Sequence, residues 1–274
     1  MRFIAILGLV YGCAVAPVAH ASLLFDDFND GNDAGWTRYD PLAPFGAAAT
    51  FSFPGGGYRI QAPTSPLPGV VGPGRAGGFR PDTGSANFLL GVDLVGWDDT
   101  LEQGFGLVAR GGELGLGTGD GYWMHYITRI PQSPGVGALV LDRIDNEIPL
   151  ILGVAPIKLD PTQDYRLVFT GVGTLLTGQI FSLSDLTIPL VTLMATDSAY
   201  TSGVAGLLVS DLNVGVNGPA DATFDNFQAS SVAAPSGLAL FVIGMLALMG
   251  GRRIVPASSR NCGSRSEAGA RRPD

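Results

Sequence analysis

Carboxylates dominate the side chains of this sequence that could do chemistry. Between Ser22 and Pro235 there are nineteen Asp and three Glu against nine basic residues, a net charge of −13. Calcium takes oxygen ligands and suits scattered Asp side chains, whereas nucleic acid needs basic clusters and is excluded as a partner. Asp142 and Asp145 could work as an acid–base pair, although so acidic a stretch contains such pairs by chance.

Other catalytic and metal-binding groups are scarce. His125 is the only histidine after Ser22, and a Ser-His-Asp site would have to use it. The Gly-x-Ser-x-Gly turn that presents a nucleophilic serine is absent, so a histidine that packs on a sheet is favoured. Cys13 and Cys262 both lie outside residues 22–235, which excludes a disulfide or a Cys/His zinc site there. Residues 111–121 are rich in glycine but lack the lysine of a phosphate-binding loop.

Aromatic residues form the one cluster that suggests a ligand. Tyr122, Trp123 and Tyr126 lie close in sequence, with Trp36 and Trp97 elsewhere. Sugar rings stack on aromatic faces, so a sheet that bears Tyr122, Tyr126 and Arg129 could hold a glycan. The alternative is core packing, which the same residue types also perform and which is favoured.

Short apolar runs between glycines and prolines predict an all-β fold. The chain has 40 Gly and 19 Pro, and residues 22–235 hold few strong helix formers. In residues 122–129 alternation places Tyr122 and Tyr126 on one face and Trp123 and His125 on the other. Residues 165–172 and 177–184 flank Gly173 as a hairpin would. Further strands are expected at residues 88–95, 105–110, 138–144, 204–209 and 222–229, and a long loop or lid at 62–80.

The order of these runs resembles a concanavalin A-like or laminin G-like jelly roll over residues 22–230. The motifs that carry the resemblance are Leu24-Phe25-Asp26-Asp27-Phe28, Asp164-Tyr-Arg-Leu-Val-Phe169, Asp197-Ser-Ala-Tyr200, Gly203-Val-Ala-Gly206-Leu-Leu-Val209 and Ala222-Thr-Phe-Asp225-Asn-Phe227. The resemblance implies a two-sheet antiparallel jelly-roll sandwich in which the first and last strands pair.

The same resemblance implies a calcium site and a catalytic pattern to look for. In jelly rolls of this kind a structural calcium joins the two chain ends, and the analogous residues are Asp27 or Asp30 with Asp225. The alternative, slightly favoured, is that these carboxylates alternate with buried phenylalanines as solvent-facing residues. Glycosidase relatives carry Glu-x-Asp-x-x-Glu on one strand, a spacing that none of the three Glu between Ser22 and Pro235 matches.

The N-terminus predicts export. Arg2 precedes an apolar run, and Ala19-His20-Ala21 follows it, which is the pattern of a secretory signal peptide over residues 1–21 with cleavage after Ala21.

The C-terminal region predicts a membrane segment. Residues 236–251 carry no charge and Arg252-Arg253 follow, as at a transmembrane helix with a cytoplasmic basic flank. Pro235-Ser236, the apolar helix and the arginine pair, within residues 231–253, resemble the PEP-CTERM sorting signal of Gram-negative bacteria. The resemblance implies processing by an exosortase, although Ala233-Ala234 stand where that family has Pro-Glu. An ordinary C-terminal anchor is the alternative. Residues 254–274 are predicted to be a disordered basic tail.

These observations predict an exported, non-enzymatic protein of the bacterial cell surface or extracellular matrix. Its expected partners are an exosortase-type enzyme, the membrane through residues 236–251, and polysaccharide. The alternatives are a glycan-active hydrolase or lyase on the same fold, and a structural envelope protein with an uncleaved anchor.

Overall fold

The computed structural model describes residues 23–130, 135–212 and 218–232. The chain divides into two units, Met1–Ala234 and Pro235–Asp274, and every described residue belongs to the first. The predicted signal peptide, the sorting segment from residue 233 onward and the basic tail therefore lie outside the described residues.

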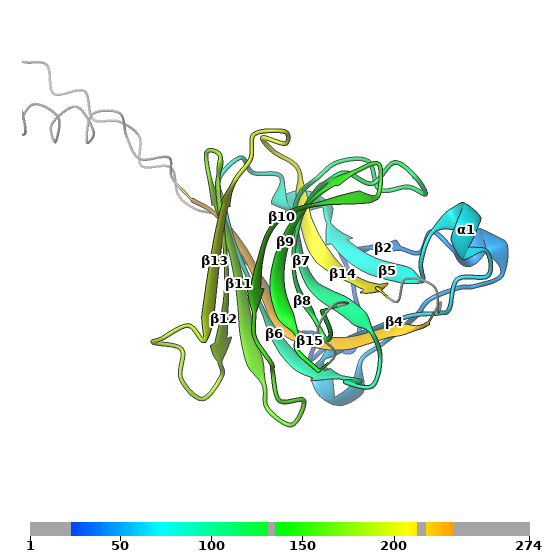
Figure 1. The fold of residues 1–274 in the computed structure, drawn as a ribbon, viewed down its shortest axis with the longest axis horizontal. Coiled ribbons are helices and arrows are strands. Elements are labelled where there is room, and N and C mark those ends of the chain that lie inside the picture. The colour runs from blue at the N-terminus through cyan, green and yellow to red at the C-terminus, as the bar shows by residue number, and fades with distance from the viewer. Residues whose placement is uncertain (1–22, 131–134, 213–217, 233–274) are drawn as a thin grey trace, which may run out of the picture. The chain divides into compact units, whose positions relative to one another are not determined.

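The described residues fold into two antiparallel sheets that form a sandwich, which confirms the predicted all-β jelly roll (Figure 1). The eight-stranded sheet has the order β13-β12-β11-β6-β15-β4-β3, with β1 also paired to β15. Its strands are β1 (Leu23–Asp26), β3 (Thr50–Ser52), β4 (Tyr58–Ala62), β6 (Phe88–Trp97), β11 (Tyr165–Val172), β12 (Leu175–Ser182), β13 (Val191–Thr196) and β15 (Ala220–Ser231).

The seven-stranded sheet has the order β10-β9-β8-β7-β14-β5-β2. Its strands are β2 (Thr37–Tyr39), β5 (Arg75–Arg80), β7 (Gln103–Gly111), β8 (Gly121–Ile127), β9 (Ala138–Asp145), β10 (Ile148–Pro156) and β14 (Val204–Asp211). Sequence alternation missed β2, β3, β4, β10 and β13, of which all but β4 lie at the edges of the two sheets. Pro149 and Pro156 made β10 hard to predict, because a proline in the sequence usually argues against a strand. An edge strand tolerates proline, and β10 is one.

The helices are short. They are α1 (Pro68–Val71) and the 3-10 turns η1 (Ala43–Phe45), η2 (Pro54–Gly56) and η3 (Pro81–Thr83). No helix within the described ranges is long and apolar enough to cross a membrane.

The prediction of one long loop over residues 62–80 is wrong for residues 75–80, where β5 pairs with β14 and β2. Glycine is required within this strand for a steric reason. A Cβ at Gly78 would approach the rings of Trp36 and Tyr58 to 3.1 Å, so the glycine makes room for these rings in the strand.

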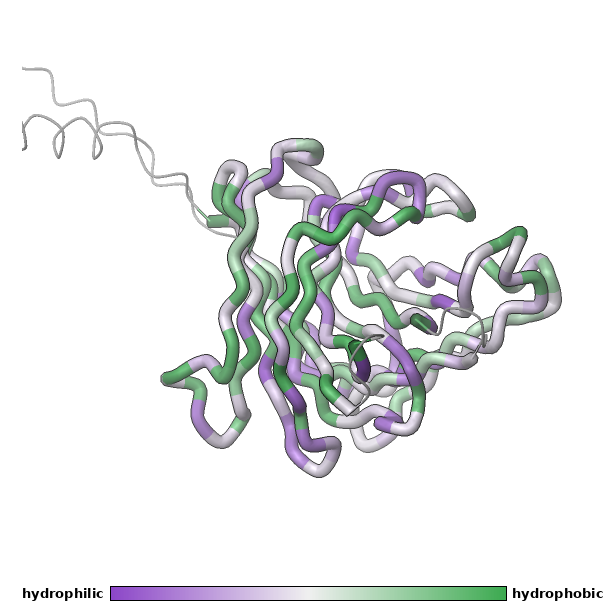
Figure 2. Tube along the Cα trace, viewed as in Figure 1, coloured by the Kyte–Doolittle hydropathy of each residue, from purple (hydrophilic) through white to green (hydrophobic). Residues whose placement is uncertain are grey.

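The core lies between the sheets. Alternate residues of each strand point inward, so that β11 and β12 bury every second side chain. Figure 2 shows hydrophobic residues recurring along the strands and again around α1. The pairing of the first and last strands is confirmed, since β1 lies antiparallel to β15 with Asp26 opposite Phe227.

Candidate functional site

The outer face of the seven-stranded sheet carries a second hydrophobic layer. Tyr39, Phe79, Val108 and Trp123 pack together there, with Ile144, Val204 and Leu208 beside them. Trp123 is opposite Val108 on β7 and Asp142 on β9, and its strand neighbours Tyr122 and Met124 point into the main core. Every residue of β7 and β8 is buried, which means that other segments cover the outer face.

Three segments cover this face and leave a pocket between them. They are the connection that contains α1, the loop of residues 112–120 between β7 and β8, and the start of β10 (Figure 1). The pocket has a volume of about 760 Å³, within the size range of small-molecule sites. We call it the outer-face pocket. Tyr39, Val108, Trp123 and Leu208 line it from the sheet.

A buried ion pair ties the covering segments together. Arg75 Nη2 donates to Glu147 Oε2 at 2.7 Å, and Arg75 Nε donates to Oε1 at 2.8 Å. The Tyr39 hydroxyl and the Gly117 N–H also donate to this carboxylate. Arg75 Nη1 donates to the carbonyl of Val71 at 2.8 Å and so holds the α1 connection. One carboxylate therefore joins β5, β2 and the 112–120 loop.

Burial acts on both members of the pair. It lowers the pKa of Arg75 to about 10, and the guanidinium remains charged at neutral pH. Burial raises the pKa of Glu147, while the hydrogen bond from Gly117 acts in the opposite direction. The two groups are only 9% and 12% exposed, so each depends on the other for compensation of its charge.

The position of Glu147 comes from a two-residue hairpin turn. Asn146 and Glu147 join β9 to β10 with φ of 51° and 63°. Positive φ at both central residues matches the right-handed twist of a hairpin, and asparagine tolerates it better than most residues. Sequence reasoning set Glu147 aside for lack of a catalytic spacing. An Asn-Glu pair between two apolar runs was the available signal for the turn.

A second polar cluster lies on the same outer face. His125 Nε2 and Asp142 Oδ2 are 2.9 Å apart, and the Trp123 ring stacks on the imidazole with 3.6 Å between centroids. His125 is 2% exposed, as expected for a histidine packed on a sheet. Within the part of the chain that the structure describes, Trp123 Nε1, His125 Nδ1 and Asp142 Oδ1 are buried without a hydrogen-bond partner. Of these three residues, Trp123 lines the outer-face pocket.

The two tyrosines considered for glycan binding pack in the core, as the favoured alternative predicts. Tyr122 and Tyr126 are fully buried between the sheets. The Tyr122 hydroxyl donates to Asp197 at 2.6 Å, and the Tyr126 hydroxyl accepts from the Leu159 N–H at 3.2 Å. Burial raises the pKa of Tyr126 to about 12. These two rings are inaccessible to a ligand because they face the core, and Trp123, between them in sequence, faces the pocket.

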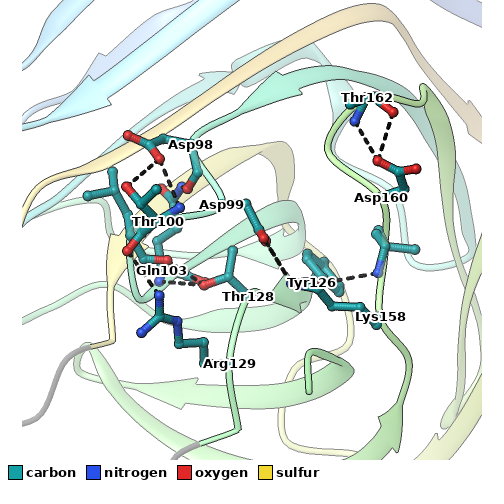
Figure 3. A network of polar contacts seen from close by, with 12 residues as sticks. Asp98, Asp99, Thr100, Gln103, Tyr126, Thr128, Arg129, Lys158, Asp160 and Thr162 are labelled. Atoms are coloured by element: carbon teal, nitrogen blue, oxygen red, sulfur yellow. Dashed lines mark hydrogen bonds and ion pairs between the residues drawn. The ribbon is translucent and has the colours of Figure 1, made fainter. Parts of the chain in front are cut away.

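Arg129 belongs to a polar network beyond the end of β8 (Figure 3). It lies 3.4 Å from Glu102 and donates to the carbonyl of Thr100. Nearby, Lys158 pairs with Asp99 at 2.9 Å. A second hollow of about 620 Å³ lies in this region, lined by residues that include Arg59, Trp97, Asp98, Asp99, Thr100 and Asp221. The structure therefore separates Arg129 from the outer-face pocket.

Asp197 predicts a pH dependence of stability. Burial alone would raise its pKa, but the Tyr122 hydroxyl, the Ala199 N–H and the Arg143 guanidinium hold it below its ordinary value. A lowered pKa in the folded state stabilises the protein above the unfolded-state pKa, and this contribution is lost as pH falls through the folded-state pKa. We expect Asp197→Asn to lower the free energy of unfolding at neutral pH, and to flatten its decline between about pH 5 and about pH 3. Urea unfolding at about pH 5 and at about pH 3 measures this decline. If the free energy of unfolding falls with pH as steeply in Asp197→Asn as in the parent protein, the prediction is wrong.

The two acids considered for catalysis do not form a pair. Asp142 contacts His125, whereas Asp145 pairs with Arg143 at 2.8 Å and accepts from the Tyr200 hydroxyl at 2.7 Å. Residues three apart on a strand point to opposite faces, which explains the separation.

The carboxylates considered for calcium accept hydrogen bonds from nearby backbone N–H groups. Asp27 and Asp30 each accept the backbone N–H two residues further on, as in Asx turns, and Asp225 accepts the N–H of Asn226. Burial, Asp93 and Asp27 raise the pKa of Asp225. Among the described residues no group of three or more His, Cys, Asp or Glu is placed to hold a metal ion. The sorting residues Pro235, Ser236, Arg252 and Arg253 and the cleavage residues Ala19 and Ala21 lie outside the described residues.

The fold is similar to that of known carbohydrate-binding proteins. Carbohydrate-binding module CBM66 from Bacillus subtilis matches with a TM-score of 0.51 and 16% identity, over 73% of this chain and 98% of that one. The CBM2 module of the evolved Dit protein of a Lactobacillus casei phage matches with a TM-score of 0.51 and 14% identity, over 78% and 98%. Basic winged bean lectin, in a structure with Tn-antigen, matches with a TM-score of 0.52 and 9% identity, over 77% and 98%. Identities this low show a shared fold. No protein-family model matches the chain, and no curated protein matches its sequence.

Proposed function

We propose that this protein is a non-enzymatic glycan-binding module whose ligand occupies the outer-face pocket. The observation that carries the proposal is a pocket of about 760 Å³ on the outer face of the seven-stranded sheet, with Trp123 and Tyr39 in its lining. The jelly-roll fold, which carbohydrate-binding modules and a lectin share, supports the same class of ligand.

The residues that line the pocket suit a sugar ring. Ile148 and Leu116 offer exposed apolar surface to the C–H face of a ring, and Trp123, Val108 and Leu208 line the pocket from the sheet. Asp120 and Asn146 also line the pocket and offer oxygen and amide groups to hydroxyls. Specific small-molecule sites have this composition, with a mostly apolar wall and a few polar groups that fix orientation.

A pair of matched variants tests the site. Ile148 lines the pocket and is 70% exposed, while Ile188 is 69% exposed and lies in the connection before β13. Both tolerate a charge without cost to the core, so Ile148→Glu is expected to weaken glycan binding by about tenfold or more and Ile188→Glu to leave it unchanged. The measurement is binding of the full chain to a glycan array, with reducing-end release assayed on every glycan bound. Absence of binding, equal effects of the two variants, or turnover of the bound glycan would overturn the proposal.

We also propose that the protein is exported and sorted to the cell surface or extracellular matrix by an exosortase. The support comes from the signal-peptide pattern of residues 1–21 and from Pro235-Ser236, the uncharged run and Arg252-Arg253. Intact mass and terminal peptide mapping of the protein from its own cells test this. A C-terminus near Pro235 is the expected result. A chain that retains Arg252-Arg253 in the membrane fraction would identify a plain anchor instead.

A further inference from the structure

The edge strand β13 lacks the features that usually protect the edge of a sheet. It ends the eight-stranded sheet, and within the part of the chain that the structure describes it pairs with β12 alone. An edge strand presents a row of free backbone donors and acceptors, which proteins protect with charges, prolines, bulges or short strands. β13 has six residues with no charge and no proline, and its register against β12 is continuous. It is therefore open to the addition of a further strand.

The other strands that end the two described sheets are protected. β2 and β3 are only three residues long. β10 contains Pro149 and Pro156, and its register against β9 shifts between Ile151 and Gly153. Of the four strands at the ends of these sheets, β13 alone is both regular and longer than three residues.

The backbone of β13 directs its free donors outward at alternate residues. Asp197 donates its N–H to the carbonyl of Thr174 at 3.0 Å, directly beyond the β12–β13 pairs and in the same register. Because donors along an antiparallel strand alternate in direction, the N–H groups of Thr192 and Met194 point away from β12. Both side chains are exposed, whereas Leu193 between them packs against the core. A strand added to this edge would therefore bond to Thr192 and Met194.

The charge of the chain favours a second copy as the partner. Residues 22–235 carry a net charge of −13, so two copies repel each other over most of their surface. Residues 167–196, which include β12 and β13, contain one charged side chain, Asp185. Two copies can approach each other along this edge without that repulsion.

A second apolar edge lies on the same flank of the sandwich. β10 ends the seven-stranded sheet and lies beside β13, and a Cβ at Gly153 would approach Leu193 Cδ1 to 3.1 Å (Figure 1). Leu150, Ile151 and Val154 of β10 are 47%, 63% and 43% exposed, and β10 carries no charge. A two-fold axis at β13 brings the β10 edges of two copies toward each other, whereas a single added peptide would cover one strand. A second copy therefore removes more apolar surface from water.

We infer that two copies of this chain pair β13 with β13, antiparallel, about a two-fold axis perpendicular to the eight-stranded sheet. The pairing continues this sheet from one copy into the other. It places the outer-face side chains Thr192, Met194 and Thr196 of each copy beside the same three of its partner, as neutral cross-strand pairs.

The same axis sets the direction of the outer-face pockets. Both seven-stranded sheets lie on one side of the joined sheet, so both pockets open toward that side. Two sites that face one way can bind one polymer or one surface together, which strengthens binding without a new contact. This consequence rests on the proposed function, whereas the pairing of the two copies does not.

Thiol crosslinking of the full chain in a mild detergent tests the pairing. In a Cys13→Ser, Cys262→Ser background, Met194→Cys places the only cysteine on the β13 edge. Thr50→Cys is the matched control, because Thr50 is exposed on β3 at the opposite end of the same sheet. Across a β13–β13 pair the Cβ atoms are about 5–8 Å apart, which a short bis-maleimide spans. We expect a crosslinked dimer from Met194→Cys and none from Thr50→Cys. Equal yields from the two variants, or no dimer from Met194→Cys, would overturn the inference.

A change in the backbone tests which groups make the contact. Thr192→Pro removes an outward N–H, a change that an edge strand tolerates, and Thr192→Val keeps this N–H. In sedimentation velocity we expect the parent chain and Thr192→Val to form dimers, and Thr192→Pro to associate about tenfold more weakly or worse. Near-ultraviolet circular dichroism confirms that each variant is folded. Equal association of Thr192→Pro would overturn the pairing through β13. A monomeric parent chain would also overturn it and leave the edge to a strand of another protein, while the proposed glycan site, which lies within one copy, would stand.

Discussion

Arg75→Met is expected to lower the free energy of unfolding by about 3–5 kcal/mol, the usual cost of leaving one member of a buried ion pair without its partner. The substitution removes both hydrogen bonds to Glu147 and the bonds to the carbonyls of Val71 and Pro73. Glu147 would then stay buried with only the Tyr39 hydroxyl and the Gly117 N–H to compensate its charge. Urea unfolding at neutral pH measures the loss.

Two controls separate burial from the mere loss of an arginine. Arg59 pairs with Asp221 at a surface position, where its side chain is 40% exposed, and Arg59→Met should cost no more than about 1 kcal/mol. The double variant Arg75→Met with Glu147→Leu removes the stranded carboxylate and should recover much of the stability. If Arg75→Met and Arg59→Met cost the same, the Arg75–Glu147 pair does not hold the walls of the pocket as described.

Arg110→Met is expected to destabilise the sandwich by about 3 kcal/mol, because several hydrogen bonds from one buried cation are lost together. Arg110 is 3% exposed, and its guanidinium donates to the carbonyls of Ala86 and Tyr200. A third carbonyl, that of Gly173 in the turn between β11 and β12, accepts from Arg110 Nη2 at 2.7 Å. Burial lowers the pKa of Arg110. No carboxylate is bonded to it among the described residues, so its charge is compensated by carbonyl dipoles and by the rings of Phe88 and Tyr122.

Arg110→Lys distinguishes charge from geometry. Lysine keeps the cation but lacks the planar fork that reaches three carbonyls, and we expect an intermediate loss of stability. Thermal and urea unfolding of the two variants would show this order. A lysine variant as stable as the parent protein would mean that the positive charge alone is needed, and a methionine variant of full stability would contradict the role of Arg110 altogether.

The hydrophobic pattern was sufficient for the all-β class and for the β11–β12 hairpin. Alternation assigned Tyr122 and Trp123 to opposite faces, and the flanks of Gly173 predicted the β11–β12 hairpin. The resemblance to a jelly roll, carried in part by the aspartate- and phenylalanine-rich motifs at the two ends of the domain, implied that β1 and β15 would pair. The alternation and the hairpin depend on periods of two residues and on turn chemistry, which are local and therefore visible in a linear sequence.

The candidate site was not visible in the same way. Alternation states that Tyr122 and Trp123 face apart, but it does not say which face is the core when both carry apolar residues. Sequence reasoning favoured packing for the tyrosines and kept glycan binding as the other possibility, and the structure places them between the sheets. In β7 and β8 both faces are buried, because the α1 connection, the 112–120 loop and β10 cover the outer face.

The pair that closes the pocket shows the physical reason for this limit. Arg75 and Glu147 are 72 residues apart in sequence. They meet because β5 positions Arg75 and the two-residue turn after β9 positions Glu147. Hydrogen bonds to the α1 connection and to the 112–120 loop then hold both side chains in place. Local patterns determine which residues share a strand and a face, since steric and hydrophobic preferences act between near neighbours in the chain. How the sheets and loops pack decides which polar groups meet and which indole N–H is left without a partner. That packing depends on contacts between residues that are distant in sequence.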